Sequence, residues 1–426
     1  MLAEFANRRT RLTVRSAFYA AAALLAILAV VFAFFELAGF AVLFLVLSTG
    51  VSAVLARYDN MFHMTWLTAH LLFCVVPSLI CLATAFPIIF ELPALCTALT
   101  AIAIALTDRP APDVGQVWRP SPPFFICVLV VALIVLVISR GESVLFSIPL
   151  IVLLFGVATR ERPVLVTIGL YVLLMSFVLI YAVTYWNGFG RLILAATLII
   201  PSLLVFRQLK VPFGKLVFLV SACVLGLFGT LLRFRDTTFA SILRASLSDS
   251  NSGPLLLGSS IIERARNGIV IDLPGWFDQV ILIFLAVWPR AWWREKPLGF
   301  GAAWVADNMG PGYWGHSIAS TFMGEHIYYL GLAWGSAAAF ASLILIALTY
   351  NAMMQARSLF GLGGYLVAVY LPTFYWGGMA SFATRFWIGL IPLLVALLVF
   401  NLIKGSVGAK ARTGRWRARP ARSHGG

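Results

Sequence analysis

The chain is divided into apolar runs of about twenty residues joined by short polar connections. A helix needs about 20 consecutive apolar residues to cross a hydrocarbon core about 30 Å thick. By this rule the first nine expected spans are 17–36, 38–56, 65–86, 88–107, 123–139, 144–159, 163–185, 189–206 and 212–232. Three more are expected at 320–350, 363–380 and 385–403. The pattern predicts an all-α polytopic membrane protein with about 12 transmembrane helices.

The composition agrees with this fold class. Of the 426 residues, 61% are hydrophobic and 11% are charged, whereas a soluble domain carries about 25% charged residues. The net charge of +15 is compatible with nucleic-acid binding. However, the basic residues gather at the two ends of the chain and in short loops between apolar runs, which is the positive-inside pattern. We therefore expect no nucleic-acid partner.

One long polar segment, 233–319, interrupts the apolar runs and contains a short apolar stretch at 279–288. As a helix this stretch is about 15 Å long, too short to cross. Without a crossing there, the basic ends and loops all lie on the cytoplasmic side. We expect 279–288 to be a re-entrant or interfacial helix. The predicted organisation is a nine-helix region at 1–232, an outer loop at 233–319, three helices at 320–403 and a basic cytoplasmic tail at 404–426.

Five basic residues of the outer loop lie where positive charge is disfavoured. They are Arg264, Arg266, Arg290, Arg294 and Lys296. The planar guanidinium group binds phosphate through two parallel hydrogen bonds and stays charged. The cluster predicts a phosphate or pyrophosphate ligand. Internal ion pairs with the acidic residues of the same loop are the alternative.

His316 and Glu325 lie at the entrance to the span expected at 320–350. An ionisable group near membrane depth is a candidate functional residue. Either side chain could act as a general base on a sugar hydroxyl. The alternatives are a structural histidine and an acid favoured by the helix dipole in the first helical turn.

Aromatic residues are dense between Trp276 and Tyr329, with Trp292 and Tyr328 among them. Their rings suit the apolar faces of sugars, but interfacial belts are also rich in Trp and Tyr. Gly331 and Gly335 form a Gly-x-x-x-Gly pair, which favours close helix packing. The five cysteines lie in apolar runs without metal-ligand spacing, so we expect neither zinc nor disulfides. No nucleotide-binding motif and no acidic cluster is visible, so we expect no metal and no cofactor.

Three motifs in this order resemble the bacterial Wzy-type polymerases of O-antigen or exopolysaccharide repeat units. The first is Pro289-Arg290-x-Trp292-x-x-x-Lys296-Pro297. Gly315-His316-Ser317 follows, and then Gly324-Glu325-x-x-Tyr328-x-x-Gly331-x-x-x-Gly335. The resemblance covers about 75 residues, and the segment around Arg264 and Arg266 matches only loosely.

The resemblance implies a C-type glycosyltransferase-like fold in the bacterial inner membrane. Such enzymes join oligosaccharide repeats carried on undecaprenyl pyrophosphate at the periplasmic face, without metal or nucleotide. It implies that Arg290 binds pyrophosphate and that His316 or Glu325 is the base or orients the acceptor. The other candidate substrate-binding residues are Arg264, Arg266, Arg294, Lys296, Trp292, Ser317 and Tyr328. Expected partners are the lipid-linked oligosaccharide, membrane lipids and, as a candidate, a chain-length regulator.

Two other functions stay open. An O-antigen ligase uses the same lipid-linked donor with a different acceptor. A transporter or lipid-linked-oligosaccharide flippase predicts charges at mid-membrane and broken helices. Few such charges are visible in the sequence; Glu91, near the end of its expected span, is one.

Overall fold

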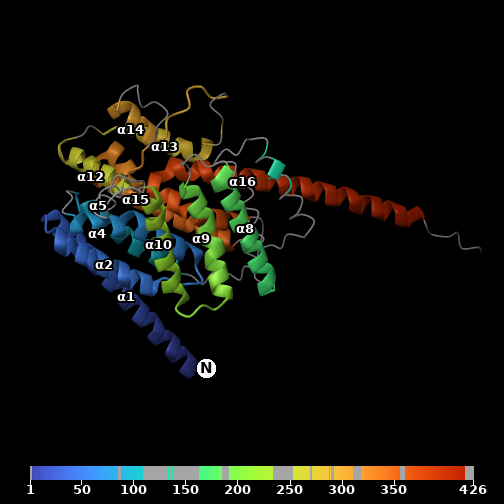
Figure 1. Cartoon of the computed structure of the whole chain (residues 1–426), viewed down its shortest axis with the longest axis horizontal. Coiled ribbons are helices and arrows are strands. Elements are labelled where there is room, and N and C mark those ends of the chain that lie inside the picture. Colours follow the sequence, from blue (N-terminus) through green and yellow to red (C-terminus); the bar gives the residue numbers. More distant parts are fainter. Residues whose placement is uncertain are drawn as a thin grey trace, which may run out of the picture.

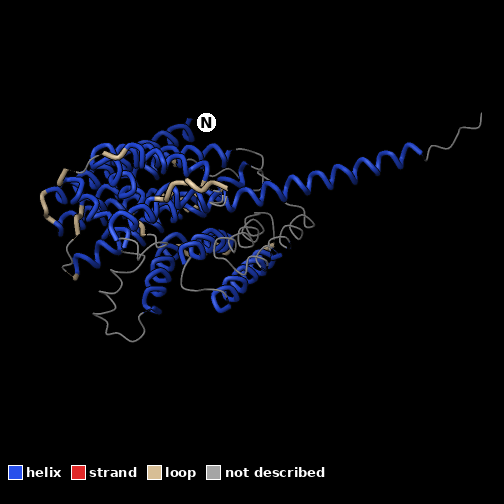
Figure 2. The backbone as a smooth tube through the Cα atoms, turned by 90° about the horizontal axis from the view of Figure 1, so that it is seen from above, coloured by secondary structure: helices blue, strands red, loops and turns tan. Residues whose placement is uncertain are grey.

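The computed structural model describes most of the chain. The described residues are 2–84, 88–108, 130, 133–134, 137, 163–184, 191–233, 253–268, 271–286, 288, 292–309, 318–355 and 360–417. Over these residues the structure is helical and contains no strand, as the apolar runs predict. The helices gather into one bundle, from which the C-terminal end of the last helix projects (Figures 1 and 2).

The N-terminal half contains a short π-helix, η1, within the third apolar run. Its elements are α1 (Leu2–Phe34), α2 (Ala38–Leu55), α3 (Met61–His70), η1 (Leu71–Val75), α4 (Val76–Ala83), α5 (Glu91–Leu106), α8 (Val164–Thr184) and α9 (Arg191–Gln208). The remaining elements are α10 (Gly214–Arg233), α12 (Gly253–Arg266), α13 (Leu273–Leu285), α14 (Phe300–Met309), α15 (Thr321–Gln355) and α16 (Phe360–Arg417).

Five of the described helices are long and apolar enough to cross a membrane. They are Val14–Phe34, Ala38–Leu55, Met61–Ala83, Val164–Tyr181 and Thr321–Gln355. Shorter apolar helices occur at Glu91–Leu106, Leu198–Gln208, Gly214–Val224 and Leu273–Leu285. The spans expected at 123–139 and 144–159 lie outside the described residues. The chain is thus a helical protein with the features of a membrane-embedded fold, and the count of twelve spans stays a prediction.

Small residues let α1 lie close to its neighbours. Ala22, Ala26, Ala29 and Ala33 recur at helical spacing and are 0–3% exposed. The hydroxyl of Ser48 on α2 donates to the carbonyl oxygen of Ala22 at 2.9 Å. Small side chains permit this approach of two backbones where lipid-like surroundings supply little hydrophobic drive.

The short helix predicted at 279–288 corresponds to α13, which begins at Leu273. The Asp272 side chain accepts a hydrogen bond from the backbone N–H of Gly275 at 2.9 Å, and Pro274 stands in the first turn. An N-cap acid followed by proline is a strong helix start. Pro274 and Gly275 read as turn residues, and Asp272 and Asp278 interrupt the apolar run, so a search for apolar runs misses the start of this helix.

Helix α15 is two helices that fold back on one another at Gly331. The φ angle of Gly331 is 73°, and this residue ends a half-helix, 321–330. His326 Nε2 lies 3.0 Å from Ser342 Oγ, although sixteen residues of straight helix span about 24 Å. A Cβ at Gly335 would lie 2.5 Å from the Cα of Ile327. The single span expected at 320–350 is therefore a helical hairpin, and its second arm, 332–355, is about 36 Å long.

Helix α16 is also broken, at Gly378, where φ is 76°. The part before the break packs in the core, where Phe374 and Tyr375 are 0% exposed. The part after the break first packs on α13, where Trp387 Nε1 donates to the Ile283 carbonyl oxygen at 2.7 Å. The C-terminal end of α16 then projects from the bundle (Figure 1). The spans expected at 363–380 and 385–403 correspond to these two parts, with the break at Gly378 rather than in the 381–384 connection.

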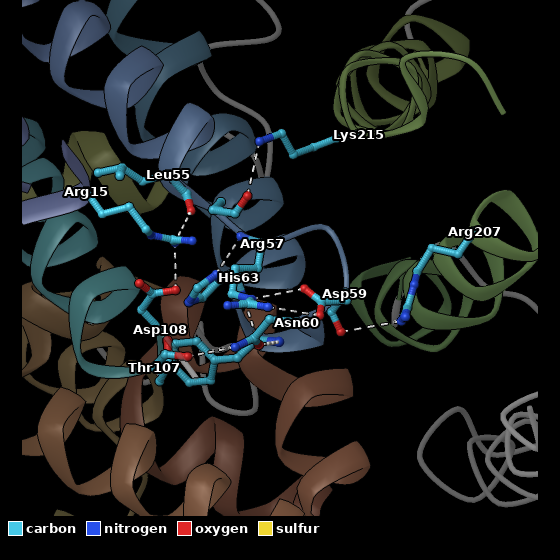
Figure 3. A network of polar contacts seen from close by, with 12 residues as sticks. Arg15, Leu55, Arg57, Asp59, Asn60, His63, Thr107, Asp108, Arg207 and Lys215 are labelled. Atoms are coloured by element: carbon cyan, nitrogen blue, oxygen red, sulfur yellow. Dashed lines mark hydrogen bonds and ion pairs between the residues drawn. The ribbon is translucent and has the colours of Figure 1, made fainter. Parts of the chain in front are cut away.

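Polar side chains mark one end of the bundle, shown in Figure 3. Arg15 forms an ion pair with Asp108 at 2.7 Å and donates to the Leu55 carbonyl oxygen at 3.0 Å. Lys215 donates to the Ala53 carbonyl oxygen at 2.6 Å, near the end of α2. We call this the Arg15 end. It gathers basic residues from near the ends of the apolar runs, which the positive-inside rule assigns to one side.

The opposite ends of α1 and α5 define the other end of the bundle. Glu36 follows α1, Glu91 begins α5, and Arg266 at the end of α12 forms an ion pair with Glu91. We call this the Glu91 end. Arg266 belongs to the polar segment 233–319. Its ion pair with Glu91 therefore connects that segment to the bundle at the end opposite the Arg15 end.

Candidate functional site

Glu325 lies in the half-helix 321–330 and is 0% exposed. Its Oε2 accepts a hydrogen bond from the backbone N–H of Met379 at 2.7 Å. Its Oε1 is buried and has no hydrogen-bond partner. A buried carboxylate oxygen without a partner is costly, so such an atom requires an explanation. This carboxylate is the centre of the candidate site.

The break at Gly378 makes room for this carboxylate. A Cβ at Gly378 would overlap Glu325 Oε2, and the positive φ of this residue is one that glycine adopts without strain. The helix that follows the break presents its first N–H groups to the carboxylate. Since a helix N-terminus carries a partial positive charge, the contact is favourable for an ionised acid. The expected alternative, an acid in the first turn of its own helix, is not what the structure shows, since the first turn of α15 contains no acidic residue. The helix start that Glu325 contacts belongs to α16.

Strain marks the start of the half-helix as well. Thr321 has φ +66°, an unusual conformation for a β-branched residue. Its Oγ1 accepts from the backbone N–H of Gly324 at 3.3 Å. Backbone strain of this kind concentrates at functional sites. The half-helix that carries Glu325 is therefore held in a defined place at both ends, by Thr321 and by Gly331.

His326, next to Glu325, fixes the half-helix from its other side. Trp276 Nε1 donates to His326 Nδ1 at 3.0 Å, and Ser342 Oγ lies 3.0 Å from His326 Nε2. Because the indole N–H can only donate, Nδ1 must be the unprotonated nitrogen. Nε2 therefore carries the proton and donates to Ser342 Oγ, which donates to the Ala338 carbonyl oxygen at 2.8 Å. This assigned tautomer leaves the neutral ring without a free lone pair.

Sequence reasoning singled out Glu325 and gave His326 no role. The signal available was weak, since a histidine in an apolar helix shows no partner in the sequence. Its partners lie 50 residues before it, in α13, and 16 residues after it, beyond the Gly331 turn. Both partners become neighbours only through the hairpin and the packing of α13.

Tyr328, a predicted substrate-binding residue, links the half-helix to α14. Its hydroxyl donates to Asp307 Oδ2 at 3.0 Å. Its neighbour Tyr329 accepts two hydrogen bonds from the α13 region. The backbone N–H of Asp272 donates to the Tyr329 carbonyl oxygen at 2.8 Å, and Gln279 Nε2 donates to the Tyr329 hydroxyl at 3.2 Å. The half-helix is thus the common support of α13 and α14.

The two arginines of α12 are found apart from Glu325. Arg264 is exposed and donates to Asn308 Oδ1 at 2.7 Å. Arg266 forms the ion pair with Glu91. These contacts are of the internal kind that the sequence left open as an alternative. A role of either arginine in substrate binding stays a prediction.

The loop after α13 holds three more predicted residues. Trp292 is 75% exposed and contacts Trp288 edge to face, and Arg294 is exposed. Lys296 Nζ donates to the carbonyl oxygens of Ala286 and Trp288, at the C-terminal end of α13. A cation there complements the negative end of the helix dipole. Lys296 has a structural role in capping α13, and Trp292 and Arg294 face outward.

The remaining candidates, Arg290, His316 and Ser317, lie outside the described residues. Arg385 lies in the second part of α16. Its Nη1 donates to the Ser381 carbonyl oxygen at 2.7 Å, while its Nε is buried without a hydrogen-bond partner. Since α16 begins its second part at Met379, Arg385 stands less than two turns from the helix start that Glu325 contacts.

Among the described residues, no group of three His, Cys, Asp or Glu side chains is placed to bind a metal ion. The chemistry available at the site is that of one buried carboxylate beside a helix N-terminus. Such an arrangement can accept a proton or orient a hydroxyl group. In the comparisons with known proteins, no family model, curated protein or solved structure matches this chain.

Proposed function

We propose that this chain is a polymerase that joins undecaprenyl-pyrophosphate-linked oligosaccharide repeats at the periplasmic face of the bacterial inner membrane. The observation that carries the proposal is Glu325, a fully buried acid with one oxygen bound to a broken helix and the other unpartnered. The acid belongs to the motif that resembles the Wzy-type polymerases. A C-type glycosyltransferase-like fold with about twelve spans is part of the same proposal.

In the proposed reaction, a hydroxyl group of the acceptor repeat attacks the anomeric carbon of the donor sugar. The bond from that carbon to the pyrophosphate oxygen breaks, and undecaprenyl pyrophosphate leaves with the bonding electrons. Glu325 Oε1 is the group proposed to take the hydroxyl proton, with His316 as the other candidate. Arg290, supported by Arg294, would stabilise the negative charge on the leaving pyrophosphate. No metal or cofactor enters the reaction.

The proposed orientation puts the Arg15 end in the cytoplasm and the Glu91 end in the periplasm. The support is the charge pattern. The Arg15 end, shown in Figure 3, contains four basic residues: Arg15, Arg57, Arg207 and Lys215. Cytoplasmic ends carry such an excess of Lys and Arg. With this orientation both termini are cytoplasmic.

A transporter or flippase is the second candidate, because one observation favours it. Two helices are broken, at Gly331 and Gly378, and Glu325 binds the N-terminus created by the second break. Discontinuous helices whose ends face polar groups are a feature of transporter sites. A ligase remains the nearest enzymatic rival, since it shares the donor and differs in the acceptor.

The experiment is an analysis of surface and lipid-linked glycan in a strain that lacks this gene. The strain is complemented with the wild-type protein, with Glu325→Gln or with Glu263→Gln. Glutamine at 325 keeps an oxygen for the Met379 N–H and removes the carboxylate. Glu263 is an exposed acid on α12, so its variant is the matched control.

The polymerase proposal predicts a ladder in the wild type and the control, and a single repeat unit in the deletion and Glu325→Gln strains. Equal membrane levels of each variant, measured by immunoblot, exclude loss of the protein. Long chains stranded on the lipid carrier would identify a ligase instead. Repeat units trapped on the cytoplasmic face would identify a flippase. Normal polymer from Glu325→Gln would remove the carboxylate from the mechanism.

A further inference from the structure

A cavity of about 440 Å³ lies at the Glu91 end, between the α1–α2 turn, α4, the start of α5 and the end of α12. Its volume falls in the range of about 300–1,000 Å³ that is usual for ligand pockets. The charged lining residues are Glu36, Glu91 and Arg266. Glu325 and its contacts do not line this cavity, so the inference below does not depend on the proposed function.

The charges of the lining are mixed and sum to −1. Arg266 is paired with Glu91, which is 7% exposed, so this carboxylate is held inside the wall. Glu36 is exposed and stands across the α1–α2 turn. A ligand with a cationic group meets two carboxylates, and its anionic group meets one guanidinium. A purely anionic ligand, such as a lipid diphosphate, meets a net negative lining.

The rest of the lining is apolar. It includes Leu82 at the end of α4 and Ile88 and Phe90 before α5. Beside the cavity, Phe35 and Leu37 flank Glu36 and are 67% and 46% exposed. In a membrane-embedded fold, exposed apolar side chains of this kind contact lipid. The cavity therefore combines a charged pair, a further acid and an apolar wall at the edge of the bundle.

We infer that this cavity binds the headgroup of a zwitterionic phospholipid of the phosphatidylethanolamine type. The ammonium group of the lipid lies near Glu36 and Glu91, and its phosphate accepts from Arg266. The upper part of an acyl chain packs on Leu82 and Ile88. Charge complementarity selects this lipid over an anionic one, and the apolar wall selects it over soluble phosphoethanolamine.

The test uses the purified full-length protein in mild detergent. Short-chain phosphatidylethanolamine, phosphatidylglycerol and soluble phosphoethanolamine are titrated separately. Bound lipid is counted by native mass spectrometry, and the unfolding midpoint is followed as a function of ligand concentration, because a ligand of the folded state raises it. The expected order of affinity is phosphatidylethanolamine first, with at least about fivefold selectivity over phosphatidylglycerol for one partly exposed charge pair.

Two variants and a control make the result specific. Glu36→Gln removes the exposed acid and should abolish the selectivity between the two lipids. The double variant Arg266→Gln/Glu91→Gln replaces the partly exposed ion pair by two amides and should weaken phosphatidylethanolamine binding at least about fivefold. Glu295→Gln, an exposed acid outside the cavity lining, should bind like the wild type.

Equal binding of both lipids by the wild type would overturn the inference, as would a preference for phosphatidylglycerol. Displacement of bound phosphatidylethanolamine by micromolar undecaprenyl pyrophosphate would also overturn it and would assign the cavity to the lipid-linked donor. Binding of soluble phosphoethanolamine as tightly as the lipid would also overturn the inference, because the apolar wall would then contribute nothing to selection.

Discussion

The Oε2 atom of Glu325 accepts the backbone N–H of Met379 at 2.7 Å, across a gap that exists because residue 378 has no side chain. The two residues are 54 positions apart in the sequence. Through this contact a half-helix of α15 holds the start of the second part of α16. The stability of the break and the position of the acid are therefore linked.

Gly378→Ala should destabilise the protein strongly. The new Cβ would overlap the Glu325 carboxylate, and alanine at φ 76° and ψ −163°, a region that only glycine adopts readily, is strained by about 1–3 kcal/mol. We expect a loss of at least about 3 kcal/mol, since a buried carboxylate oxygen would also lose its partner. Thermal unfolding in detergent measures the effect. Gly169→Ala, in α8 with open space around it, is the control and should be neutral or stabilising.

Gly335→Ala tests the hairpin in α15. Its Cβ would lie 2.5 Å from the Cα of Ile327, where backbone atoms cannot give way easily. We expect a loss of about 1–3 kcal/mol from overpacking, seen as a lower unfolding midpoint and as faster cleavage near Gly331 by added protease. Gly50→Ala, a helical glycine of α2 with nothing nearby, provides the comparison. Equal midpoints for the two variants would contradict the hairpin.

The hydrogen bonds that His326 makes with Trp276 and Ser342 predict a loss of stability when either partner is removed. Trp276→Phe keeps the ring and removes the donor, so the His326 Nδ1 lone pair loses its partner at a cost of about 1–3 kcal/mol. Ser342→Ala should cost a similar amount, because the Nε2–H would be left unpaired. If the three residues form one network, the double variant should cost less than the sum of the single variants. Additive losses would argue against a shared network.

The Arg15–Asp108 ion pair should contribute modestly and depend on salt. Its side chains are 35% and 17% exposed, so a coupling energy of about 1 kcal/mol is expected from a double-mutant cycle with Arg15→Gln and Asp108→Asn. The coupling should fall in 1 M salt, where the Debye length is about 3 Å. The Arg57–Asp59 pair, whose side chains are 28% and 42% exposed, should show a smaller coupling. A larger coupling in the Arg57 pair would contradict this ranking.

The sequence alone determined the class of the fold and much of its helix content. Apolar runs such as 38–56 and 163–185 became α2 and α8 with nearly the predicted bounds, because a run of about twenty apolar residues leaves its backbone groups few alternatives to a helix in lipid. The Gly331–Gly335 pair predicts close helix packing, and Gly335 does pack closely against the backbone of Ile327. Gly331 is the turn of the hairpin instead. The sequence also singled out Glu325 as an acid in an apolar setting.

The surroundings of these residues depend on contacts between segments that are distant in the sequence. The turn at Gly331, the break at Gly378 and the pairing of Arg266 with Glu91 join segments that are 16, 54 and 175 residues apart. Helical periodicity reports contacts over three or four residues and carries no information on such separations. A glycine in an apolar run is equally compatible with close helix packing and with a break. The choice depends on whether a distant carboxylate occupies the space where its side chain would be, as Glu325 does at Gly378.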